Sequence, residues 1–154
     1  MTEKILVPLD GSKVGEAALP YVEDLVTKLK PEVKVEVILI RVLSSLSHYV
    51  VEGEVSARVP YTEQEMAEMK KQATSYLRTT AKTLQEQGTR TRVKVTVGHA
   101  AEEILKAADE INADIIAMSS HGRSGLSRWA FGSVTDKILR GGKRPVLVVK
   151  APKE

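Results

Sequence analysis

The chain has 154 residues, of which 42 % are hydrophobic and 28 % are charged, and its formal net charge at pH 7 is +3. This length and composition predict one soluble domain over residues 1–154, with no apolar run near the roughly 18 residues that a membrane-spanning helix needs. The modest charge, one Trp and one Phe argue against nucleic-acid binding, and the absence of cysteine excludes disulfides and thiolate metal sites.

The first part of the chain predicts a buried strand followed by a helix. Residues Met1–Lys4 do not form a signal peptide, which together with the lack of cysteine favours a cytoplasmic protein. Ile5–Leu9 is an apolar run that ends in the turn Asp10-Gly11-Ser12, where Ser12 is the expected helix cap. Helical spacing continues to Leu29, so Pro20 is expected inside the helix, bending it without ending it.

The next two segments predict a second strand and an irregular loop. Residues 33–42 alternate and then become continuously apolar, which is typical of a strand entering the interior of a sheet. Residues 44–61 have no clear period and contain Gly53 and Pro60. We expect an irregular loop there, either a mobile flap near a ligand or a plain variable connection.

A long helix, a third strand and a further helix follow. Thr62–Glu65 has the sequence of a capping box and predicts a helix that ends at Gly88. Val93–Val97 predicts the third strand, and the turn at Gly98 leads into a helix over Ala101–Ile111.

The C-terminal third holds the segment of greatest chemical interest. Ile115–Met118 predicts a short buried strand, and the polar loop Ser119–Gly125 follows it. Ser133 is the expected N-cap of the next helix, which ends at Gly141-Gly142, and Pro145–Val149 predicts the fifth strand.

A strand, a glycine-containing loop and a helix N-terminus can together form a phosphate site. Glycine lets the backbone approach an anion closely, and the helix offers free amides and the positive end of its dipole. Arg123 and Arg128 add positive charge in the same loop. The segment is not a P-loop, and an ordinary strand-to-helix connection remains an equally good interpretation of the residues alone.

This segment resembles the nucleotide loop of the universal stress protein family, whose ATP-binding branch carries G-x-x-G, nine residues and then G-[ST]. Gly122, the nine residues 123–131 and Gly132-Ser133 match the later part of that pattern, and Ser119 replaces its first glycine. The resemblance extends over essentially the whole chain. It implies an α/β fold with an open, parallel five-stranded sheet of order 3-2-1-4-5 and helices on both faces.

In this arrangement the strand order reverses between the first and fourth strands. Asp10 and the Ser119–Ser133 loop therefore face one crevice, where ligands bind in open α/β sheets. The resemblance implies ATP there, with or without Mg²⁺, and no dedicated metal-binding residues. It places adenine near Asp10, Val42 and Gly98. The full set of expected ligand-binding residues is Pro8, Leu9, Asp10, Ser12, Val42, Gly98, Met118, Ser119, His121, Gly122, Arg123, Gly125, Gly132, Ser133, Val134 and Thr135.

Three functions are compatible with this sequence. The first is a regulatory module that binds ATP and forms a homodimer through the edge strand Pro145–Val149, as the family usually does. The second is a slow ATPase in which His121, the titratable base of the loop, transfers a proton, although no carboxylate pair stands beside it. The third is a nucleotide-independent stress or interaction protein of the same fold. No catalytic residue is assigned firmly.

Overall fold

The computed structural model describes residues 2–29, 31–44, 47–122 and 130–151. The elements are, in chain order, β1 (Thr2–Pro8), the 3-10 helix η1 (Val14–Glu16), α1 (Leu19–Lys28), β2 (Lys34–Leu43), β3 (Ser47–Glu52), β4 (Val55–Pro60), α2 (Glu63–Glu86), β5 (Arg90–Val97), α3 (Ala100–Glu110), β6 (Ile115–Ser119), α4 (Ser133–Gly141) and β7 (Val146–Val149).

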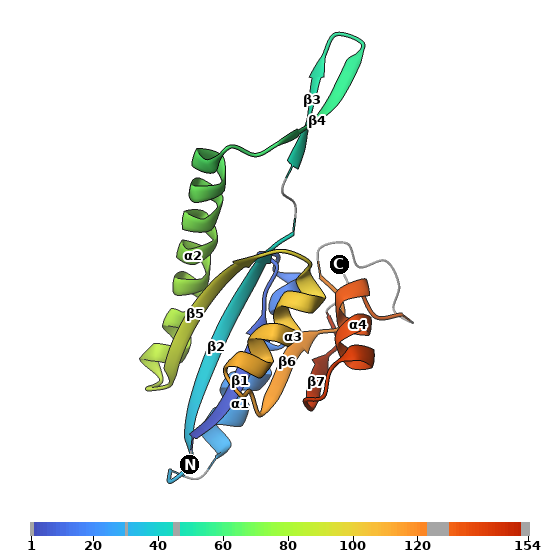
Figure 1. The fold of residues 1–154 in the computed structure, drawn as a ribbon. Helices are drawn as coiled ribbons and strands as arrows, with labels where there is room; N and C mark the ends of the chain where they lie inside the picture. Colours follow the sequence, from blue (N-terminus) through green and yellow to red (C-terminus); the bar gives the residue numbers. More distant parts are fainter. Residues whose placement is uncertain (1, 30, 45–46, 123–129, 152–154) are drawn as a thin grey trace.

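Five parallel strands form the central sheet in the order β5-β2-β1-β6-β7, which confirms the predicted order 3-2-1-4-5 (Figure 1). Strand β1 pairs with β2 along its whole length, and it pairs with β6 at Ile5 and Leu6. The carboxyl ends of β1 and β6 therefore lie side by side, as the predicted position of the crevice requires.

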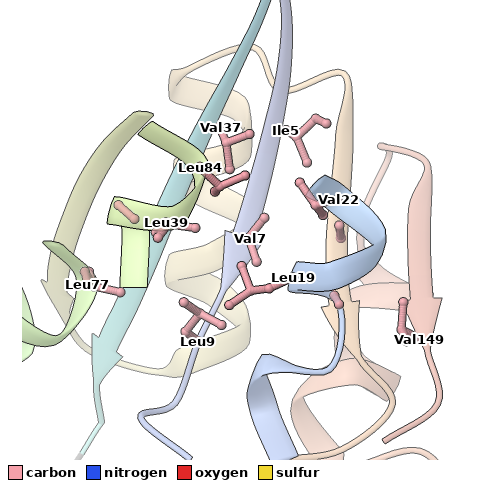
Figure 2. Packing of buried hydrophobic residues seen from close by; sticks show 13 residues of the cluster. Ile5, Val7, Leu9, Leu19, Val22, Val37, Leu39, Leu77, Leu84 and Val149 are labelled. Carbon is pink, nitrogen blue, oxygen red and sulfur yellow. The ribbon is translucent and has the colours of Figure 1, made fainter. Parts of the chain in front are cut away.

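Helices cover both faces of the sheet, so its central strands are apolar on both sides. Ile5 and Val7 of β1 pack under α1 and α2 (Figure 2), whereas Leu6 packs under α3 and α4 on the opposite face. Because successive side chains of a strand point to opposite faces, both faces of β1 must be apolar to be buried. This burial explains the continuous apolar run in the sequence.

The prediction for the first helix was wrong in its start and in the role of Pro20. The segment divides into η1 and α1, and α1 begins at Leu19. Pro20 thus occupies the first turn of α1, where the missing amide hydrogen of proline breaks no helical hydrogen bond. The proline is therefore compatible with the start of a helix and does not bend one.

The prediction of an irregular loop over residues 44–61 was also wrong. Strands β3 and β4 form an antiparallel hairpin that belongs to a separate two-stranded sheet. Figure 1 shows the hairpin projecting away from the central sheet, beyond the start of α2. Its residues 50–60 are all exposed. None of the described residues that line the candidate ligand pocket belongs to this hairpin.

Helix α2 begins with the predicted capping box. The Thr62 hydroxyl accepts a hydrogen bond from the Glu65 amide at 3.1 Å, and the Glu65 carboxylate accepts one from the Thr62 amide at 3.2 Å. The helix ends before Gly88, whose φ of 84° stops helical propagation. Within the described parts of the chain, no helix is both long enough and apolar enough to cross a membrane.

Candidate functional site

A pocket of about 180 Å³ opens at the carboxyl ends of β1, β2 and β6, beside the start of α4. It lies between β1 and β6, where the strand order reverses, which is the usual position of ligand sites in open α/β sheets. Its lining residues are Pro8, Leu9, Asp10, Gly15, Ile40, Val42, Ala100, Ile104, Met118, Ser119, His121, Gly122, Gly132, Ser133, Val134 and Thr135.

One side of the pocket is apolar. It consists of Ile40, Val42, Ile104, Met118 and Val134, which we call the apolar wall. The alternation of β2 places Ile40 and Val42 on the face of the sheet that α3 and α4 cover. Ile104 of α3 and Met118 of β6 are buried on the same face. The apolar wall can therefore contact the flat face of a ring.

Asp10 stands at the polar side of the pocket, directly after β1. Its Oδ1 accepts hydrogen bonds from both the amide and the hydroxyl of Ser12, at 2.9 and 2.6 Å. The Ser12 hydroxyl oxygen in turn accepts a hydrogen bond from the Gly15 amide at 3.0 Å. These three bonds fix the orientation of the carboxylate. Ser12 thus supports Asp10 and is not itself part of the pocket lining.

The start of α4 faces the pocket, and its N-cap is Gly132 rather than the predicted Ser133. The Gly132 carbonyl accepts the first helical hydrogen bond, from the Asp136 amide at 2.9 Å, and no side chain of the described residues caps the helix. The first amides of a helix have no intrahelical partner, so those of Ser133 and Val134 are available in the pocket.

Gly132 does not need the conformational freedom of glycine, because its φ is −60°. The close approach of His121 explains the missing side chain better. A Cβ at Gly132 would lie 3.2 Å from the Cα and 3.2 Å from the Cβ of His121, closer than most Cβ contacts. A side chain at this position would press on the segment that follows β6.

Hydrogen bonds tie the end of β6 to both η1 and α4. The buried Thr135 hydroxyl donates to the Ser119 carbonyl at 3.0 Å. The Ser119 hydroxyl lies 3.0 Å from the carbonyl oxygen of Val14 and 2.8 Å from that of His121. The serine that replaces the first glycine of the family motif therefore directs its hydroxyl towards backbone carbonyl groups.

Ser120 links the segment after β6 to the start of α4 and to β7. Its carbonyl accepts from the Gly132 amide at 2.9 Å, and its amide donates to the Val149 carbonyl at 2.8 Å. Its hydroxyl oxygen accepts from the Ala151 amide at 3.0 Å and lies 3.3 Å from Nδ1 of His121. The His121 ring therefore has a serine hydroxyl as a partner at the pocket.

Most of the residues expected at the site come together in this single pocket, but some do not. Ser12 and Gly98 lie outside its lining, and Arg123 and Gly125 fall outside the described residues. Gly98 has a φ of 147°, and a Cβ there would meet the side chain of Glu103. This conformation and this contact explain why residue 98 is glycine, and neither of them involves a ligand. No group of three or more metal-ligating side chains occurs among the residues that the structure describes.

The sequence interpretation missed four lining residues, Gly15, Ile40, Ala100 and Ile104. Ile40 was predictable, because it lies two residues before Val42 on the same face of the same strand. Ala100 and Ile104 belong to α3, whose position over this end of the sheet depends on tertiary packing. Gly15 gave no signal in the sequence, since its role depends on the position of the Asp10 carboxylate.

The chain matches known proteins along nearly its whole length. A family model described as the universal stress protein family matches residues 1–150. Universal stress protein MJ0577 of Methanocaldococcus jannaschii is 33 % identical over 159 aligned residues, which cover 97 % of this chain and 96 % of that protein. The solved structure of MJ0577 is similar with a TM-score of 0.76 at 29 % identity, over 99 % of this chain and 98 % of the other.

Two more distant solved structures share the fold and contain adenine nucleotides. A universal stress protein in complex with cAMP has a TM-score of 0.62 at 19 % identity, over 97 % of this chain and 98 % of that one. A family protein from Arabidopsis thaliana with AMP bound has a TM-score of 0.65 at 15 % identity, over 97 % and 92 % of the two chains.

Proposed function

This chain belongs to the universal stress protein family, and we propose that it is a regulatory module that binds ATP, with or without Mg²⁺, in the pocket at the carboxyl end of the sheet. The observation that carries the proposal is the combination, in one pocket, of the apolar wall with the uncapped N-terminus of α4. The first suits an aromatic base, and the second suits a phosphate group. Relatives of the same fold with bound cAMP and AMP support the nucleotide class.

The proposed arrangement gives each part of the nucleotide its own surface. The base lies against Ile40 and Val42, and Asp10 stands at the polar side of the same pocket. The phosphates lie at the amides of Ser133 and Val134, near the segment that contains His121. The glycine at position 132 keeps a side chain away from both that segment and the anion.

The direct test is to look for a nucleotide in the protein and then to measure its return. Freshly purified protein is denatured, and the released small molecules are identified by mass spectrometry. Stripped protein is then titrated with ATP by calorimetry. We expect saturable binding of one ATP per chain. No binding at about 1 mM ATP, where a site of about −4.1 kcal/mol is half filled, contradicts the proposal.

We also propose that the protein forms a homodimer through β7. This strand is at the edge of the central sheet, and Val146, Leu147 and Val148 are only partly buried. An exposed apolar edge favours pairing with a second strand. Light scattering is expected to give twice the monomer mass, and a mass that stays monomeric at every concentration contradicts this assembly.

A further inference from the structure

The Asp10 carboxylate stands between two residues that have no side chain. A Cβ at Gly15 would meet Oδ1 of Asp10, and a Cβ at Gly122 would meet Oδ2, in both cases closer than the 3.0 Å that real Cβ atoms respect. At Gly122, the three nearest atoms to such a Cβ all belong to Asp10. Both glycines and Asp10 line the ligand pocket.

The carboxylate cannot easily move away from an added side chain. Its Oδ1 is held by the amide and the hydroxyl of Ser12 at 2.9 and 2.6 Å, and the Ser12 hydroxyl oxygen is held by the Gly15 amide. Rotating the carboxylate away from Gly122 would break the two bonds to Ser12. An alanine at position 122 must therefore displace either this network or the backbone that follows β6.

We propose that Asp10 is a positioning residue that sets the place of the Gly122 backbone, and that position 122 is glycine to accommodate this carboxylate. The contact joins the end of β1 and η1 to the segment after β6, and so it fixes the distance between two sides of the pocket. Gly132 differs, because its nearest neighbour is His121. The inference rests on the proposed nucleotide site only where ATP binding is the readout.

A double-mutant cycle tests the contact with Gly122→Ala, Asp10→Ala and the double variant. ATP affinity is measured by calorimetry, and the free energy of unfolding by urea denaturation. Stability is the readout that needs no nucleotide. A contact between the two residues predicts strong coupling, since effects of residues that touch are not additive.

With Asp10 present, we expect Gly122→Ala to weaken ATP binding about tenfold, which corresponds to about 1.4 kcal/mol. It should also lower stability. In the Asp10→Ala background the same substitution should change affinity less than about twofold and change stability much less, because the space for the methyl group then exists.

Gly141→Ala is the matched control, because the nearest atom to a Cβ there is Cδ1 of Leu105 at 3.6 Å, an ordinary contact. It should leave ATP affinity unchanged and should not lower stability. Additive effects of the two substitutions, or a Gly122→Ala protein that resembles the wild type, would overturn the proposal. If Gly122→Ala does not fold, a folded double variant supports the contact and an unfolded one contradicts it. If the wild type binds no ATP, the coupling in stability still decides this inference, while the proposed function fails separately.

Discussion

Replacing Thr135 with valine isolates the hydrogen bond that holds the start of α4 to the end of β6. Thr135 is 2 % exposed, and its hydroxyl donates to the Ser119 carbonyl at 3.0 Å. Valine has nearly the same shape, so it creates no cavity and removes only the donor. A lost intramolecular hydrogen bond costs about 0.5–1.5 kcal/mol, and leaving a buried partner unsatisfied costs about 1–3 kcal/mol. We expect Thr135→Val to lower the free energy of unfolding by about 1–3 kcal/mol.

Urea denaturation measures this change as a lower midpoint at an unchanged slope. Thr74→Val is the control, because the Thr74 hydroxyl donates within α2 to the Lys70 carbonyl, which the helix already uses. The control should change stability by less than about 0.5 kcal/mol. A Thr135→Val protein as stable as the wild type, or one that loses no more than the control, refutes the role given to this bond.

Three further substitutions test other parts of the structure. Gly132→Val should weaken ATP binding at least about tenfold because its side chain presses on His121 and on the phosphate position; unchanged affinity in a folded variant, measured by calorimetry, argues against this phosphate site. His121→Ala should reduce any ATP turnover, itself far below about 10 per second, while binding is largely retained; equal turnover in a phosphate-release assay removes His121 from the chemistry. Burial and the hydrogen bond to Glu16 raise the pKa of Tyr76 above its ordinary value of 10.0. The protonated phenol therefore stabilises the folded state fully below pH 10.0, and this contribution is lost as the pH rises further. When the pH is raised above that value, the free energy of unfolding should therefore fall less in Tyr76→Phe than in the wild type. Equal decreases, measured by urea denaturation, contradict this.

The fold was predictable because its information is local. The apolar run Ile5–Leu9 and the capping box Thr62–Glu65 each encode an element within a few residues. The hairpin was harder to predict, because its residues 50–60 are exposed on both faces, so the strands lack the alternation of apolar and polar residues that burial of one face produces. Gly53 forms part of the hairpin turn between Glu52 and Val55, whereas the sequence analysis assigned it to an irregular loop.

The site was predictable only in part, because its details depend on contacts between distant segments. The position of the pocket followed from strand order and from the loop before α4. The N-cap did not, since both Gly132 and Ser133 are acceptable caps and tertiary packing decides between them. The contacts of Gly15 and Gly122 with Asp10 have no pattern in the sequence, because a glycine does not indicate which neighbour requires it.

The most direct test of the central claim is an NMR titration of the isotope-labelled protein with ATP. If ATP occupies the pocket, the amide signals of Leu9, Val42, Val134 and Thr135 should shift together and saturate. The signals of Thr89 and Arg90, which line a separate hollow beside the amino end of β2, should stay unchanged and serve as the internal control. Shifts that cluster around Thr89 and Arg90, or no saturable shift at any residue of the pocket, would contradict the account.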